Sequence, residues 1–137
     1  MNWLFWALLS AFFAGLTAIL AKVGVKGVDS NLATAIRTIV IVAFAWLVAL
    51  ITNKQPLATI SLRTWLFLAL SGLATGLSWL CYFRALQLGE ASRVAPIDKL
   101  SVIVAIVLAG IFLHERLTWH QWVGGGFIVT GALILAR

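Results

Sequence analysis

Asp98 and Lys99 are the residues of this chain best suited to chemistry. They are an acid and a base side by side near the start of a long apolar stretch, two residues after Pro96. Charged groups are costly inside a membrane, so an apolar helix that keeps them usually turns them toward a cavity or a substrate pathway. Lys99 can extend its long side chain to the membrane surface, whereas Asp98 is too short to do so. Asp98 is therefore the stronger candidate for a proton- or cation-sensitive group, the alternative being a structural salt bridge.

Arg37 is a third charged residue within an apolar stretch. It is the sixth residue of its stretch, and Asp98 and Lys99 are the fifth and sixth residues of theirs. At the rise of a helix, all three lie about 7–9 Å below the same membrane surface, which makes an ion pair between Arg37 and Asp98 geometrically possible. The functional interpretation is a polar vestibule in which Arg37 or Lys99 attracts an anionic substrate. The alternative for both basic residues is that they extend to the interface.

A polar face follows the third apolar stretch. Ser71, Thr75, Ser78 and Tyr82 are spaced four, three and four residues apart, which places them on one side of a helix. Trp79 lies close to this face in the sequence. The face either lines a cavity or packs inside the bundle, and Trp79 and Tyr82 are its cavity-lining candidates.

Pro96 shapes the helix that carries the charged pair. Proline lacks a backbone N–H, so it is tolerated in the first turn of a helix and disrupts the helix further in. The sequence favours a helix that begins close to Pro96. The alternative is a helix that begins near Ala91, in which Pro96 produces a kink and frees carbonyl groups at the depth of Asp98.

The sequence gives little support for catalysis or for a cofactor. His114 and His120 lie near the opposite membrane surface from Asp98, and the chain has no histidine–carboxylate metal motif or glycine-rich phosphate loop. We therefore expect no enzyme activity, no cofactor and no bound metal. The formal net charge of +6 is concentrated in loops and helix ends. It indicates contact with anionic lipid headgroups and not with nucleic acid.

Five membrane-spanning helices are predicted to position these residues. Of the 137 residues, 63% are hydrophobic and only 10% are charged, with a mean hydropathy of +1.08. Apolar runs of about 20 residues indicate bilayer spans, and in lipid a helix is what satisfies its own backbone. The sequence predicts an all-α, polytopic membrane protein, a bundle with spans Trp3–Ala21, Leu32–Ile51, Thr64–Phe83, Val94–Leu113 and Leu117–Ala136. The short connections predict a single domain over residues 1–137.

The basic residues outside these spans do not set one orientation. Five spans place the N-terminus and the second and fourth loops on one side, side A, and the first and third loops and the C-terminus on the other, side B. Side A then carries three basic residues and side B five, namely Lys54, Arg63 and Arg116 against Lys22, Lys26, Arg84, Arg93 and Arg137. This near-balance favours insertion in both orientations, which is typical of a transporter half before fusion. The alternative is a single orientation.

Six of the seven tryptophans fall toward side A in this scheme, and Trp79 falls toward side B. Tryptophan rings favour the level of the lipid headgroups, so the outer five are interpreted as an aromatic belt. Trp46 is deeper and either packs within the bundle or lines a cavity. The six are Trp3, Trp6, Trp46, Trp65, Trp119 and Trp122.

Several stretches resemble the EamA-type family of the drug/metabolite transporter superfamily. One runs from Tyr82 to Ser92 and continues with Val94-Ala95-Pro96, and another is Leu113-His114-Glu115-Arg116-Leu117-Thr118. Gln121, the glycines from Gly124 to Gly131 and Arg37 also match the pattern of that family. The resemblance covers nearly the whole chain.

The resemblance implies a carrier of small metabolites. Typical members have ten helices in two inverted halves, with the substrate cavity between them, and this chain has the length of one half. The implied assembly is a homodimer, expected to be antiparallel, or a pair with a second half-size chain. In smaller four-helix relatives a glutamate of the first helix carries proton coupling. The first span here has no acid, which leaves Asp98 for that role.

We therefore expect a half-size secondary transporter of small metabolites or drugs in the cell inner membrane. It would act as a dimer, by alternating access around a cavity near the midplane. One alternative is a non-transporting accessory subunit of a membrane complex. Another is a flippase subunit for a lipid-linked substrate, in which the basic residues of side B meet a phosphate headgroup.

Overall fold

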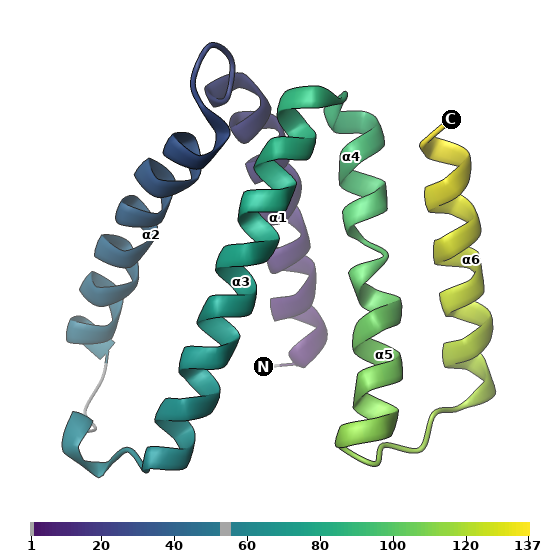
Figure 1. Ribbon diagram of the computed structural model, residues 1–137. Helices are drawn as coiled ribbons and strands as arrows, with labels where there is room; N and C mark the ends of the chain where they lie inside the picture. Colours follow the sequence, from purple (N-terminus) through teal and green to yellow (C-terminus); the bar gives the residue numbers. More distant parts are fainter. Residues whose placement is uncertain (1, 53–55) are drawn as a thin grey trace. The chain divides into compact units, whose positions relative to one another are not determined.

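The computed structural model describes residues 2–52 and 56–137, so Lys54 of side A lies outside it. The described residues form helices and no strand, as predicted (Figure 1). The helices are α1 (Trp3–Gly24), α2 (Ser30–Thr52), α3 (Leu62–Leu88), α4 (Ala91–Asp98), α5 (Ser101–Phe112) and α6 (Trp119–Leu135), with a short 3₁₀ turn η1 (Leu57–Thr59).

Four helical stretches are long and apolar enough to cross a membrane. They are α1, α2, α3 and the continuous range Ala91–Phe112, and at most 6% of the most apolar window of each is buried. Such uncovered apolar surface needs lipid or another chain around it. The fifth predicted span, Leu117–Ala136, contains α6, whose 17 residues extend about 25 Å. Its crossing of the membrane stays a prediction.

The start of α2 shows why the sequence-based boundaries are slightly short. The Asp29 carboxylate accepts hydrogen bonds from the backbone N–H groups of Asn31 and Leu32, at 2.9 and 3.0 Å. This is the N-cap arrangement that satisfies the free donors of a first turn. The helix therefore begins at Ser30, two residues before the predicted Leu32.

The fourth span differs from the helix that the sequence favoured. It begins at Ala91 and not at Val94, so Pro96 lies inside α4 and does not start it. Because Pro96 has no N–H, the carbonyl of Ser92 loses its usual i+4 donor. The favoured position of Pro96 was wrong, and the alternative start near Ala91 is confirmed.

The same span is also interrupted directly after Asp98. The N–H of Lys99 donates to the carbonyl of Pro96 at 3.1 Å, and that of Leu100 donates to Ile97 at 3.0 Å. These are i−3 bonds, which indicate a tight 3₁₀-type turn in place of regular α-helix. The charged pair therefore lies at a junction between α4 and α5, whereas a single helix was predicted.

Contacts between Cα atoms divide the chain into two compact units. The first unit comprises residues 1–22 and 88–137, and the second comprises residues 23–87. In the first unit α6 lies along both α4 and α5. A Cβ built on Gly125 of α6 would lie 3.1 Å from the Ile103 side chain of α5, so the missing side chain permits this close approach.

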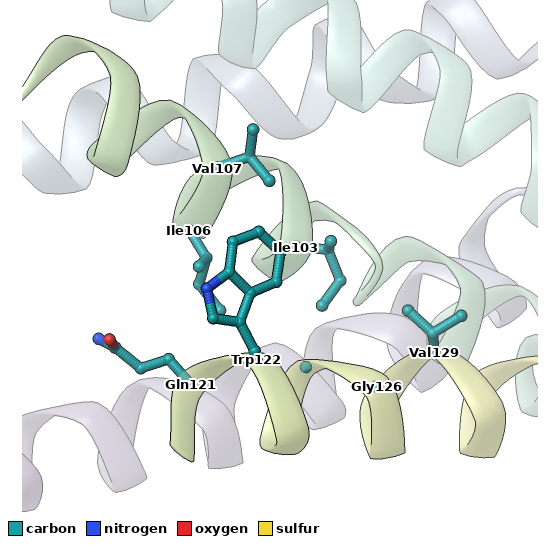
Figure 2. Close-up of a pocket in the computed structure, with 8 residues that line it drawn as sticks. Ile103, Ile106, Val107, Gln121, Trp122, Gly126 and Val129 are labelled. Atoms are coloured by element: carbon teal, nitrogen blue, oxygen red, sulfur yellow. The ribbon is translucent and has the colours of Figure 1, made fainter. Parts of the chain in front are cut away.

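A groove of about 230 Å³ lies between α5 and α6 in the first unit. Figure 2 shows the Trp122 indole beside Ile103, Ile106 and Val107, with Gln121 directed to one side. The lining is almost entirely apolar, and Gln121 is its polar member. The groove has the chemistry of lipid or helix contact and offers no charged group to a polar solute.

In the second unit the buried side chains come from one end of α2 and α3 and from Val25, in the connection between α1 and α2. Ser30 and Thr34 are buried at the start of α2, and Phe83 and Leu86 are buried in the last turns of α3. At the other end, α2 beyond residue 49 and α3 up to residue 75 are exposed. In α2 and α3, buried side chains thus occur at the Arg37 end.

Candidate functional site

Arg37 and Trp79 form the centre of the candidate site. The guanidinium carbon of Arg37 lies 4.6 Å from the centre of the Trp79 ring and 5.4 Å from that of Phe83. Both distances fall within the range of a cation–π interaction. The structure therefore brings together two of the predicted site residues, Arg37 and Trp79, and adds Phe83.

Helical spacing explains how α3 presents two rings to one cation. Trp79 and Phe83 are four residues apart, so their side chains share one face of α3. Phe83 is only 3% exposed, so its ring is held by the side chains packed around it. Tyr82 meets Phe83 edge to face, with ring centres 6.5 Å apart. Tyr82 thus belongs to the same aromatic cluster as the two rings that face Arg37.

Exposure separates Trp79 from the other tryptophans. Trp79 is partly buried, whereas the other six are at least half exposed. A ring that anchors in the headgroup region needs a free surface, and a ring that holds a cation needs a partner. The six exposed residues are Trp3, Trp6, Trp46, Trp65, Trp119 and Trp122, and the place of the outer five in an aromatic belt stays a prediction.

Hydroxyl groups near the site bond to their own helices. Thr34 donates to the carbonyl of Ser30, and Thr38 donates to that of Thr34, both at 2.8 Å. On the predicted polar face of α3, Thr75 donates to the carbonyl of Ser71 at 2.9 Å. Such bonds are common for threonine in helices. Thr75 is exposed, so whether that face lines a cavity or packs inside the bundle stays a prediction.

Gln87 joins the end of α3 to the loop before α2. Its side-chain amide donates to the carbonyl of Val28 at 2.9 Å, and its oxygen accepts from Arg84 at 2.7 Å. These bonds hold the two helix ends that carry Arg37 and Trp79. Arg84 and Gln87 lie in the family-like stretch, but this role could not be predicted, because a bond to a backbone carbonyl leaves no pattern in the sequence.

Asp98 and Lys99 pair with each other in the first unit. The Lys99 ammonium lies 3.4 Å from the Asp98 carboxylate, and their side chains are 57% and 36% exposed. The exposed part of each group is available to a solute or to another chain. The ion pair between Arg37 and Asp98 stays a prediction, as do the roles of all the proposed site residues.

The acids of the described chain have identifiable positions. Asp29 caps α2, Glu90 pairs with Arg93 at 3.2 Å, Asp98 pairs with Lys99, and Glu115 lies in the connection between α5 and α6. No group of three or more histidine, cysteine or acidic residues that could hold a metal ion occurs within residues 2–52 and 56–137.

The comparisons with known proteins give the class of this chain. The family model described as the EamA-like transporter family matches residues 1–137, and the chain belongs to that family. This confirms the resemblance found in the sequence. With four apolar helical stretches, the chain is a multi-pass membrane protein of a transporter family. No solved structure shows a significant match to the chain.

A protein of Sinorhizobium sp named as an uncharacterized transporter in the cobO 3' region is 57% identical over 136 residues. That match covers 98% of this chain and 96% of the relative. A probable 4-amino-4-deoxy-L-arabinose-phosphoundecaprenol flippase subunit, ArnE of Aeromonas hydrophila, is 32% identical over 72 residues, covering 52% of this chain and 60% of that protein. A probable terminal-alkyne amino-acid exporter of Streptantibioticus cattleyicolor is 31% identical over 137 residues, which is 96% of this chain but only 44% of the exporter.

Proposed function

We propose that this chain is a half-size secondary transporter of small metabolites that acts as a dimer in the cell inner membrane. The observation that carries the proposal is the relative size of the matching proteins. The chain aligns with nearly all of a relative named as a transporter, and with less than half of a named exporter. A second copy would supply the other half of the cavity.

The uncovered surface of the second unit supports an assembly with another chain. Away from the Arg37 end, α2 and α3 expose large side chains such as Phe44, Leu47 and Leu73. In the proposed dimer, part of this surface lies against the second copy and the rest faces lipid. Alternating access then follows from rocking of the two copies around a shared cavity.

Transport is tested with the purified chain in vesicles. Uptake of radiolabelled metabolites from a mixed pool is measured against empty vesicles and against vesicles with an unrelated five-span protein. We expect solute accumulation that depends on the chain. If no solute of the pool enters under any ion gradient, the transporter proposal is rejected.

Asp98 is proposed as the coupling group, since it is an acid of the apolar spans with part of its surface free. Asp98→Asn is expected to abolish the pH dependence of uptake while leaving membrane insertion intact. Glu115→Gln, which changes an acid in the connection between α5 and α6, is the matched control and should keep the wild-type pH profile. An unchanged profile in Asp98→Asn excludes this role.

The antiparallel arrangement is tested by labelling from outside the cell. In a Cys81→Ala background, single cysteines replace Leu57 in the second loop or Ser92 at the start of α4. With a membrane-impermeant thiol reagent, each position should label in about half of the molecules if both orientations occur. Labelling at one position alone would indicate one orientation and would direct the search to a second half-size partner.

A flippase subunit is the second candidate, because two ArnE proteins named as flippase subunits match half of this chain at 31–32% identity. In that case the chain would work in a complex and move a lipid-linked substrate. Transfer of a fluorescent polyisoprenyl phosphate between leaflets, with the same vesicles, distinguishes this function from metabolite uptake.

A further inference from the structure

The guanidinium of Arg37 lies over two aromatic rings, and its N–H donors are the part that can bind a solute. Its carbon lies 4.6 Å from the centre of the Trp79 ring and 5.4 Å from that of Phe83. Guanidinium N–H donors point outward in the plane of the group, where they match two acceptor oxygens. Aromatic rings accept no conventional hydrogen bond, so these donors remain for an anion.

The second unit provides no acid that pairs with Arg37. Within residues 23–87 the only carboxylate is Asp29. Its side chain accepts from the backbone N–H groups of Asn31 and Leu32 at the start of α2. Arg37 is eight residues further along the helix, about 12 Å by the helical rise. A charge in an apolar span normally has a partner, so its counter-charge must come from outside this unit.

The size of the missing counter-charge indicates its chemical class. No other described basic residue of the unit is shown beside Arg37. Arg84 donates to Gln87, and Arg63 lies over the Phe67 ring near the other end of α3. Lys26 lies in the loop before α2. Arg37 therefore offers one positive charge. A carboxylate neutralises it, whereas a phosphate monoester would leave excess negative charge in a poorly hydrated place.

From this geometry we infer that Arg37 is the recognition point for the carboxylate of an organic monocarboxylate solute. Trp79 and Phe83 hold the guanidinium in place beside α3. The inference rests on the proposed transport function for its physiological meaning, and it names the class of substrate.

Binding measurements with the full chain in lipid nanodiscs test the inference. The probes are matched sets: benzoate, benzamide and phenyl phosphate, and hexanoate, hexanamide and hexyl phosphate, each titrated and followed by calorimetry. We expect a carboxylate to bind at least about tenfold more tightly than its amide and more tightly than its phosphate counterpart. Equal binding of acid and amide, tighter binding of the phosphate, or no binding by either carboxylate would overturn the inference.

Variants locate the binding energy. Arg37→Gln should abolish carboxylate binding. Arg37→Lys should weaken it about tenfold, because a lysine keeps the charge but loses the planar pair of N–H donors. Arg63→Gln is the matched control and should bind as the wild type does. If Arg37→Gln does not fold, Arg37→Lys decides the question, and its unchanged affinity would contradict the inference.

Asp98→Asn tests whether this aspartate already binds the N–H donors of Arg37. Carboxylate binding that is unchanged in this variant supports the inference, and binding that appears only in this variant overturns it.

The inference and the transport proposal can fail separately. Uptake of a neutral or cationic solute that is unchanged in Arg37→Lys would keep transport and reject the carboxylate site. Carboxylate binding that depends on Arg37, together with no uptake of any solute, would keep the carboxylate site and reject the transport proposal.

Discussion

Where α6 lies against α5, Gly125 leaves space for the Ile103 side chain, whereas α2 and α3 are bridged by Arg37 over Trp79 and by the Gln87 bond to Val28. The first region has no ionisable group in its groove, and its helices approach through a small residue. The second region uses a charge and long side chains, at the end where its side chains are buried. The first region therefore resembles ordinary membrane packing, whereas the second places a cation against aromatic rings, which is why we propose the solute site there.

The largest effect should come from filling the space at Gly125. Gly125→Leu places a branched side chain against Ile103 and should lower the free energy of unfolding in detergent by about 1–3 kcal/mol. Gly124→Leu is the matched control, because a Cβ there meets no atom within 4 Å. Thermal unfolding that shifts equally in both variants would show that the close contact of α5 and α6 is absent.

The Arg37–Trp79 contact is tested by a double-mutant cycle. Arg37→Gln and Trp79→Leu, alone and together, should give a coupling energy of about 0.5–2 kcal/mol in unfolding, since both changes remove the same cation–π contact. The control cycle pairs Arg37→Gln with Trp46→Leu, on the exposed Trp46. A coupling energy as small as that of the control would show that Arg37 and the Trp79 ring do not interact.

Gln87→Glu tests how much the bond from α3 to the Val28 carbonyl stabilises the fold. A glutamate still accepts from Arg84, but it cannot donate to the carbonyl of Val28, which leaves that acceptor unsatisfied. The expected loss in unfolding free energy is about 1 kcal/mol. Arg84→Gln, which leaves the bond to Val28 in place, should cost less. The reverse order of the two variants would mean that the Arg84 bond dominates.

The smallest effect is expected at the Glu90–Arg93 ion pair. Both side chains are more than half exposed, at 71% and 54%, and such pairs contribute only a few tenths of a kcal/mol. Glu90→Gln should leave the unfolding temperature almost unchanged, both at low and at high salt. A clear destabilisation that disappears in salt would mean that this ion pair contributes more to the free energy of unfolding than its exposure suggests.

Much of the helical framework could be predicted from the sequence, because apolar runs report directly on membrane helices. The predicted Trp3–Ala21 and Leu32–Ile51 lie within α1 and α2 and end at most three residues from their boundaries. The start of α2 was placed late because the capping role of Asp29 depends on two backbone bonds. The interruption after Asp98 was missed because the range Ala91–Phe112 is long and apolar enough for one continuous span, and a break in backbone hydrogen bonds within it leaves no pattern in the sequence.

The site was predicted only in part. Arg37, Trp79 and Tyr82 were found because their types are unusual in apolar spans. Their arrangement was not, because the contact of Arg37 with Trp79 joins residues far apart in the sequence. Phe83 was missed altogether, since a phenylalanine in an apolar run carries no signal of its own until a cation lies over it.

The junction after Asp98 has a consequence for the membrane itself. α4 has eight residues and α5 has twelve, which correspond to about 12 and 18 Å, and neither crosses a hydrocarbon layer of about 30 Å alone. A tight turn with an ammonium and a carboxylate therefore lies partway through the layer. Lipid tails cannot solvate such a turn, so water or headgroups must reach inward to it. The bilayer around this protein should be locally thin and hydrated on the side of Ala91.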